Sequence, residues 1–229
     1  MTHNMKPRVF MLILLTIPAA LASAMAMQQK SSQSPAQRDP TKLPARESHQ
    51  DLLVAADPWV TEEEYKARFP KDCPFDYGIM AVDVYFKNDG TFPVRINLDT
   101  IRLTITHNES ADENLPPLAA NDVAQYMLGD NGGGKNPTKR RRLPIPVHSG
   151  GNNKNDKKVL ELADMLHAVQ LQTDLVPPHS IVRGLFYFDV DGHFDWITSA
   201  KLYVPDLKLM GSDKVLFFFD VDLGKAVEQ

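Results

Sequence analysis

An alternation of apolar and polar side chains through residues 77–107 constrains the fold more than any other feature of the chain. Apolar residues recur at every second position in Val82–Phe86, in Val94–Leu98 and in Ile101–Ile105. Successive side chains of a strand point to opposite faces of a sheet. The pattern therefore predicts three strands with one buried face and one solvent-exposed face. The sequence Asn-Asp-Gly at residues 88–90 predicts a tight hairpin between the first two, because Asn and Gly tolerate positive φ.

Three further strands are expected towards the C-terminus, at Ile181–Val190, Ala200–Val204 and Val215–Leu223. The last of these is apolar on both faces, which predicts a central strand covered on two sides. The apolar run Leu52–Val54 fits either a first strand or a short helix. An early and a late group of strands can bury their apolar faces against each other, so we expect a mainly β fold, an antiparallel β-sandwich.

Helix signals lie before and between these strands. Thr61 and Glu64 form a capping box that predicts a short helix ending near Phe69. Asn121 and Asp156 are expected to cap two further helices. The second of these has an apolar stripe that predicts packing on the sandwich, formed by Val159, Leu162, Ala163, Leu166 and Val169. Residues 108–176 are therefore predicted to be a helical insertion between the early and the late strands.

The N-terminus has the three parts of a secretory signal peptide, predicted over residues 1–26. Lys6 and Arg8 precede an apolar run from Val9 to Ala22, and small residues follow it. The run is short for a stable membrane anchor, so we expect export to the periplasm or the extracellular space. The alternative is an uncleaved signal that holds the chain at the membrane. Residues 27–50 are polar and predict a disordered linker, which leaves residues 51–229 for the β-sandwich domain.

The charge balance and the cysteine content limit the kinds of partner and covalent cross-link that the sequence allows. The chain has 25 basic and 29 acidic residues, so no overall field favours nucleic acid as a partner. Cys73 is the only cysteine, which excludes an internal disulfide. We expect Cys73 to be a buried structural thiol; an intermolecular disulfide or a reactive thiol is the alternative.

A basic run is the first candidate binding site. It consists of Lys139, Arg140, Arg141 and Arg142, and four consecutive cations attract anionic partners such as a lipid headgroup, a polysaccharide or an acidic protein. A solvated loop is the alternative. The preceding residues 129–135 have the spacing of a phosphate-binding loop, but Asn136 stands where a Ser or Thr hydroxyl should bind magnesium. This substitution argues against nucleotide hydrolysis.

An acidic turn is the second candidate site. Asp189, Asp191 and Asp195 offer hard oxygen ligands, and Gly192 can make the turn, so calcium is the one cofactor that the sequence suggests. The alternative is a hairpin turn whose acidic side chains face water and bind no metal. His193 is a weaker candidate for zinc, because no second His or Cys lies near it in the sequence.

Local catalytic motifs such as Gly-x-Ser-x-Gly or His-Glu-x-x-His are absent from the sequence. A hydrolase would need a site assembled from distant residues, and His148, His179 and His193 are the candidates for it. Such a site would need a concave pocket that gathers a histidine and a carboxylate. We therefore expect a protein that is not an enzyme.

Two regions resemble small exported bacterial immunoglobulin-like domains. The first comprises Val84–Asn88, Val94–Leu98 and Ile101–Leu103; the second is Val176–Phe188, in which a proline-containing turn precedes a glycine and an aromatic strand. The resemblance implies an extracytoplasmic β-sandwich of the immunoglobulin-like type. Such domains more often bind or scaffold than catalyse. The resulting hypothesis is an exported, non-enzymatic module that binds a protein partner or scaffolds an envelope assembly.

Overall fold

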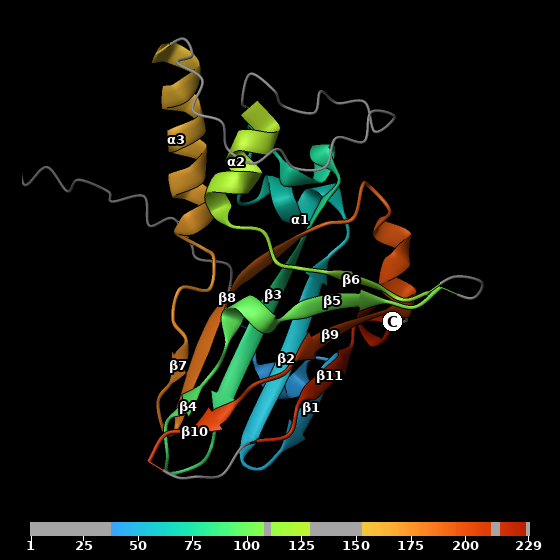
Figure 1. The fold of residues 1–229 in the computed structure, drawn as a ribbon. Coiled ribbons are helices and arrows are strands. Elements are labelled where there is room, and N and C mark those ends of the chain that lie inside the picture. The colour runs from blue at the N-terminus through green and yellow to red at the C-terminus, as the bar shows by residue number, and fades with distance from the viewer. Residues whose placement is uncertain (1–37, 108–110, 129–152, 212–215, 228–229) are drawn as a thin grey trace, which may run out of the picture. The chain divides into compact units, whose positions relative to one another are not determined.

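The central element of the fold is the strand β3 (Ile79–Asn88), which pairs with an antiparallel neighbour along its whole length on one side and over residues 81–88 on the other. The computed structural model describes residues 38–107, 111–128, 153–211 and 216–227 (Figure 1). In this part of the chain the fold is mainly β and consists of three antiparallel sheets.

Sheet A has β3 at its centre and contains, in spatial order, β1 (Arg46–His49), β2 (Leu52–Trp59), β3 and β8 (Ser180–Asp189). Sheet C contains β11 (Phe219–Asp222), β9 (Ala200–Val204), β5 (Arg102–Ile105) and β6 (Glu113–Leu115). The small sheet B contains β10 (Lys208–Leu209), β4 (Val94–Arg95) and β7 (Leu175–Val176). The 3-10 turns are η1 (Pro40–Lys42), η2 (Pro74–Tyr77), η3 (Leu98–Thr100), η4 (Phe194–Ser199) and η5 (Gly224–Ala226).

The main hydrophobic core is shared by the three sheets. Alternate residues of β3, such as Val82, Val84 and Phe86, belong to one cluster with Leu103 of β5 and Leu202 of β9. The period of two explains this, because these β3 residues all point to the same face of sheet A.

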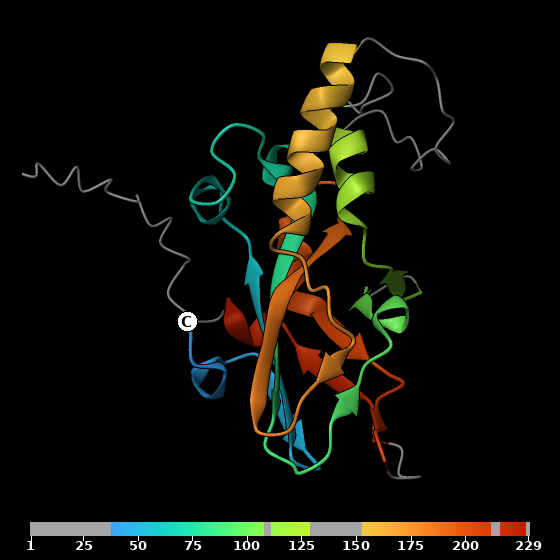
Figure 2. The ribbon, with the colours of Figure 1, turned by 90° about the vertical axis from the view of Figure 1, so that its left-hand side faces the viewer.

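The opposite face of sheet A, here called the outer face, is covered at one end by the helices. These are α1 (Glu62–Lys66), α2 (Ala120–Leu128) and α3 (Asn153–His167) (Figure 1). Helices α2 and α3 lie side by side (Figure 2). Their apolar stripes pack on Ile79, Ala81, Leu185 and Tyr187 in a second cluster. The predicted stripe of α3 is confirmed: Val159, Leu162, Ala163 and Leu166 are buried there, and Val169 packs at its margin.

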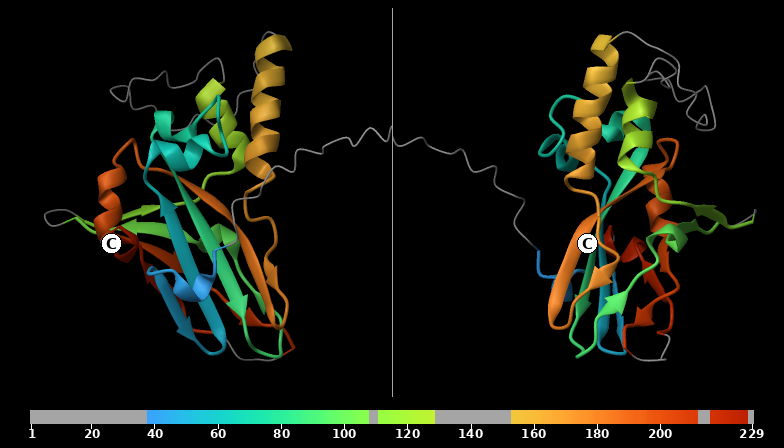
Figure 3. Two further views of the ribbon diagram at one scale, coloured as in Figure 1. Left: turned by 180° about the vertical axis from the view of Figure 1, so that it is seen from behind. Right: turned by 60° about the vertical axis from the view of Figure 1, so that its left-hand side comes forward.

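The other end of the outer face is covered by the N-terminal part of the described chain. Leu43 forms a small buried cluster with Leu53, Ala55 and Tyr85. Figure 3 shows η1 and β1, in blue, at the opposite end of sheet A from the helices. Residues 38–50 thus contain ordered structure, so the prediction of a disordered linker over residues 27–50 is wrong for this part. Buried Leu43 and Ala45 are the reason, because they anchor an otherwise polar segment.

Several predicted elements are confirmed. The strand β8 matches the expected Ile181–Val190 closely, and β9 has the expected bounds. The capping box opens α1, with Thr61 as its N-cap. The run Leu52–Val54 belongs to a strand, β2, rather than to a helix. Helix α3 begins at Asn153, before the expected cap.

Two predictions about the first strands are wrong. The sequence Asn-Asp-Gly connects β3 to β4, but these strands belong to different sheets and form no hairpin. Asn88 is buried, and its Nδ2 donates to the carbonyls of Phe92, Val176 and Pro177, which ties sheet A to sheet B. The predicted solvent-exposed face is wrong for β3, because nearly every residue of this strand is buried on both faces. The predicted alternation does hold in residues 94–97 and 101–105, where the apolar side chains are buried and the polar ones are exposed or half-buried.

The prediction for Val215–Leu223 is wrong as well. The strand β11 begins only at Phe219 and lies at the edge of sheet C. Phe219 and Val221 are buried, whereas Phe217 and Phe218 are exposed. No helix in the described ranges is long and apolar enough to cross a membrane.

The close approach of Gly184 to the backbone of residue 171 gives a first prediction. An added Cβ at Gly184 would lie 2.4 Å from both the N and the Cα of Leu171. These backbone atoms cannot move freely, because Leu171 N–H donates to Leu185 O and Leu185 N–H donates to Val169 O. We expect Gly184→Ala to lower the free energy of unfolding by about 1–3 kcal/mol, as measured by urea denaturation.

The matched control is Gly90→Ala, whose added Cβ would first meet a side-chain atom of Asn88 at 3.2 Å. This variant should lose clearly less stability. Equal denaturation midpoints for Gly184→Ala and the wild type would show that the contact does not constrain the fold.

Candidate functional site

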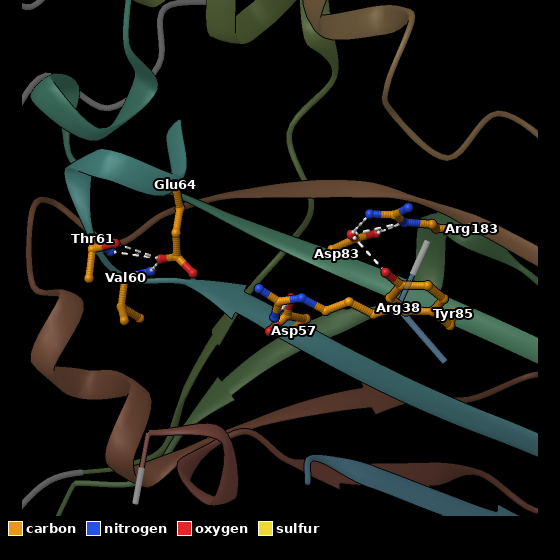
Figure 4. A network of polar contacts seen from close by, with 8 residues as sticks. All are labelled: Arg38, Asp57, Val60, Thr61, Glu64, Asp83, Tyr85 and Arg183. Carbon is orange, nitrogen blue, oxygen red and sulfur yellow. Dashed lines mark hydrogen bonds and ion pairs between the residues drawn. The ribbon is translucent and has the colours of Figure 1, made fainter. Parts of the chain in front are cut away.

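A buried ion pair lies on the outer face of sheet A, between the helices and the N-terminal segment (Figure 4). Asp83 of β3 is only 2% exposed. Arg183 of β8 donates from Nε to both carboxylate oxygens at 2.9 Å, and its Nη2 also donates to Oδ2. This geometry is a multidentate, charge-assisted contact, the kind that compensates a buried carboxylate best.

Tyr85 completes the surroundings of the pair. Its hydroxyl donates to Asp83 Oδ2 at 3.2 Å, and its ring centroid lies 4.9 Å from the guanidinium carbon of Arg183. The guanidinium therefore gains a cation–π contact in addition to the carboxylate. Burial raises the pKa of the Tyr85 hydroxyl above its ordinary value, so the group stays protonated and can donate.

A second carboxylate lies directly across the strand pair. Asp57 of β2 is the register partner of Asp83 and forms an ion pair with Arg38 at 2.5 Å. Burial raises the pKa of Asp57 to about 6; Arg38 opposes this rise, and the charge of Asp83 adds to it. Two carboxylates and two arginines thus balance each other on one face of the sheet.

This polar network has a structural role and a pH-sensitive member. Both carboxylate oxygens of Asp83 accept from Arg183, and Oδ2 also accepts from Tyr85. Asp57 is the member whose charge changes near pH 6. At the far end of the same face, Glu64 accepts the backbone N–H groups of Val60 and Thr61 at 3.0 Å, which fixes the entry to α1 (Figure 4).

A group of exposed aromatic rings lies where β1 meets β11. Phe217 is 70% exposed and Phe218 is 54% exposed. The ring of Phe218 lies 5.5 Å from that of Tyr203, and the ring of Phe217 lies 6.4 Å from that of His49. We call His49, Tyr203, Phe217 and Phe218 the aromatic patch. Its phenylalanines were expected in a buried strand, so the sequence analysis did not identify it as a surface.

The predicted acidic turn is held by its own hydrogen bonds. Asp189 Oδ1 accepts the N–H of Asp191 at 3.0 Å, and Asp191 and Gly192 both have positive φ, 51° and 80°. The side chain of Asp195 is 81% exposed and lies beside His193. Within the described ranges, no three carboxylate, imidazole or thiolate groups are gathered so that they could hold a metal ion. Calcium binding by Asp189, Asp191 and Asp195 therefore stays a sequence prediction.

The structure brings a second histidine near His193, which the sequence did not reveal. The ring of His193 stacks on Trp196 at 4.3 Å, and His107, which follows β5, meets the same indole edge-on at 5.2 Å. Each imidazole also faces one carboxylate, Asp195 at 3.9 Å and Glu113 at 3.6 Å. This arrangement is an aromatic stack with two separate imidazole–carboxylate contacts, and it is no tetrahedral zinc site.

The candidate hydrolase histidines do not meet. His179 and His193 are both exposed and lie beyond opposite ends of β8. A strand of ten residues separates them by about 30 Å, since each residue adds about 3.3 Å. These two groups cannot share one active site. His148 lies outside the described residues, as do Lys139, Arg140, Arg141 and Arg142.

Cys73 is buried in the cluster beneath the helices, as expected for a structural thiol. Burial raises the pKa of its thiol, although the backbone N–H groups of Phe75 and Asp76 oppose this rise. A protonated, inaccessible thiol reacts slowly with oxidants and with other thiols.

Comparisons with known proteins assign no family. No family model matches the chain, and no curated protein matches it. Among solved structures, a functionally unknown protein from Listeria monocytogenes EGD-e is similar over 71% of this chain and 73% of its own, with 12% identity and a TM-score of 0.32. A likeness this low supports no conclusion about fold or function.

The ion pair of Asp83 and Arg183 predicts a strong dependence of stability on both partners. Arg183→Met should lower the free energy of unfolding by about 3 kcal/mol, because it leaves a buried carboxylate without its cation. The double variant Asp83→Val/Arg183→Met should recover most of this loss. The control Arg38→Met removes a cation that is 57% exposed and should cost clearly less than Arg183→Met. The double variant is compared with Arg183→Met and Asp83→Val by urea denaturation. If its loss of unfolding free energy equals the sum of the losses in these two single variants, the pair is not coupled.

Asp57 predicts a specific pH dependence. Burial holds its pKa at about 6 in the folded chain, above the ordinary value of 3.8, so between these values the folded state retains a proton that the unfolded state loses. The contribution of Asp57 to the free energy of unfolding must therefore fall as pH rises from about 4 to about 6. The difference between wild type and Asp57→Asn should change across this range and stay constant above about pH 7.

The measurement for Asp57 is urea denaturation of both proteins at a series of pH values. Asp195→Asn serves as the matched control, since the Asp195 side chain is 81% exposed. A difference between wild type and Asp57→Asn that is the same at every pH would contradict the raised pKa.

Proposed function

We propose that this protein is an exported, non-enzymatic module that binds a protein partner of the cell envelope, or scaffolds an envelope assembly, through the aromatic patch. The observation that carries the proposal is the exposure of Phe217 and Phe218, 70% and 54%. Aromatic side chains are enriched in protein interfaces, where they contribute large contact areas at a small cost in conformational entropy. Two adjacent exposed phenylalanines on a soluble surface are a liability unless a partner covers them.

The surroundings of the patch suit a protein partner. Lys201 and Asp220 form an ion pair at 3.0 Å on the same sheet, and Asp220 pairs in register with Tyr203 of the patch. An apolar centre with charged groups beside it is the usual anatomy of a protein–protein interface. The polar rim would confer specificity, and the rings would supply most of the binding energy.

Export is the second part of the proposal and is supported by residues 1–26. Their basic start, apolar run and small residues are the parts of a secretory signal. A single, buried cysteine suits a domain that is stabilised by its core without a disulfide.

The immunoglobulin-like type of sandwich is also a proposal. It is supported by two four-stranded antiparallel sheets, A and C, whose strands share one hydrophobic cluster. An all-antiparallel pair of sheets of this kind presents its edges and loops as binding surfaces.

The variant Phe217→Ser/Phe218→Ser tests the proposed function. The mature chain, residues 27–229, is tagged and captured from a cross-linked envelope extract of its own source. We expect the wild type to retain a stoichiometric partner and the double variant to lose it, with at least a tenfold weaker affinity, because each buried phenylalanine contributes more than about 1 kcal/mol.

The matched control is Leu160→Ser, which removes a side chain of α3 that is 62% exposed and leaves the patch intact. This variant should retain the partner. Retention of the same partner by all three proteins would show that the aromatic patch is not the binding surface.

A further inference from the structure

The turn between β1 and β2 is strained. His49 pairs with Leu52, so Gln50 and Asp51 form a two-residue hairpin turn. Their φ values are 51° and 62°, and they are the one consecutive pair of non-glycine residues with positive φ in the described part of the chain. Turns of this kind favour Asn-Gly or Asp-Gly. A left-handed conformation is unfavourable for an ordinary residue, and Gln at the first position lacks the relief that Asn or Gly would give.

The segment before this turn is an arm that contacts the body of the domain along its length. We define the N-terminal arm as residues 38–49. Leu43 and Ala45 are its buried anchors, and Ala45 O accepts the N–H of Ala56 at 2.9 Å. The arm also supplies Arg38 to Asp57 and pairs β1 with β2.

The arm meets sheet C through side chains instead of a backbone ladder. Glu47 Oε2 accepts the N–H of Asp220 at 2.6 Å, and His49 Nε2 lies 3.2 Å from the carbonyl oxygen of Phe218. The ring of His49 stacks on Phe219 at 3.8 Å. The edge strands β1 and β11 therefore meet in a seam of three side-chain contacts, which can open without breaking a sheet.

We propose that the N-terminal arm exchanges between two copies of this chain, so that each arm occupies the arm site of the other copy. Each contact described for the arm joins it to residues after the turn, and an identical arm can make the same contacts from a second chain. Only the turn itself differs between the two forms. When it opens, Gln50 and Asp51 become extended and β1 continues into β2 as one strand. Strained, short hinges favour this kind of exchange.

The occupant is a second copy because the arm site matches this arm in charge and shape. Asp57 needs a cation at the position of Arg38, and the N–H of Asp220 needs an acceptor at the position of Glu47. The arm supplies both, spaced correctly on either side of Leu43 and Ala45. Opening the turn gives up the bonds from Asp89 N–H to Asp51 O and from Phe217 N–H to Gln50 Oε1. Relief of the two left-handed residues offsets this loss.

An engineered disulfide distinguishes exchange from any other dimer. Ser48 and Leu53 are register partners, one pair away from the turn. Such a non-hydrogen-bonded pair has a Cα separation of about 4.5 Å, which a disulfide can span. The variant Ser48→Cys/Leu53→Cys is made in a Cys73→Ala background of residues 27–229. Its bridge is internal in a closed monomer and joins two chains in an exchanged dimer.

The experiment separates monomer and dimer by size-exclusion chromatography with light scattering, from micromolar to millimolar protein. Each fraction is oxidised and run on a denaturing gel without reductant. We expect a dimer whose chains are covalently joined. A control bridge between Tyr203→Cys and Asp220→Cys, register partners that both lie after the turn, should stay internal in both fractions.

Two hinge variants give the direction of the effect. Gln50→Asn/Asp51→Gly, which suits a closed two-residue turn, should weaken the dimer about a hundredfold, because dissociation closes two turns and relief of roughly 1.4 kcal/mol in each corresponds to a factor of about ten. Asp51→Val, a β-branched residue at positive φ, should strengthen it. A wild-type chain that stays monomeric at every concentration, or a dimer whose Ser48→Cys/Leu53→Cys bridge stays internal, would overturn the proposal. The proteins used for these two readouts, oligomeric state and disulfide bridging, can fold with the turn closed.

Discussion

The ion pair of Asp83 and Arg183 is the interaction on which the arrangement of sheet A depends. It joins the central strand to β8 in the middle of the outer face, with helices at one end and the N-terminal arm at the other. A shift of β8 by two residues would keep every side chain on its face but would separate the two charges and bury both unpaired. The pair therefore specifies register where hydrophobic contacts alone would tolerate slippage. Tyr85 strengthens this choice, because its hydroxyl and its ring contact both partners.

How much of the fold could be predicted from the sequence depends on how far apart along the chain the contacting residues lie. The strands β8 and β9 and the capping box of α1 are local patterns, and the sequence predicts them well. The polar alternation in β3 suggested a solvent-exposed face, although Asp83 and Tyr85 are buried there. Their cover comes from Arg183, 100 residues later, and from helices and an arm on either side in the sequence. No local pattern contains that information.

The aromatic patch shows the same limit of local sequence patterns, here for apolar residues that are exposed instead of buried. A run of three phenylalanines predicts a buried strand, but only Phe219 lies under the seam with β1. Whether an apolar residue at a sheet edge is buried depends on what that edge meets. Here the edge of sheet C meets a short strand that contributes side chains, so Phe217 and Phe218 extend beyond its cover. The acidic turn, by contrast, is a local feature: its sequence predicts a turn at Gly192, and Asp189 Oδ1 accepts the N–H of Asp191 within it.

The placement of the two tryptophans gives the protein an internal optical label for each of its cores. Trp59 is buried in the cluster under the helices, whereas Trp196 packs at the margin of the main core and is stacked on His193. Because one indole lies in each of the two larger hydrophobic clusters, a change in the packing of either cluster alters the surroundings of a different tryptophan. Fluorescence can therefore follow the helical end and the sandwich separately in one sample, without an added dye.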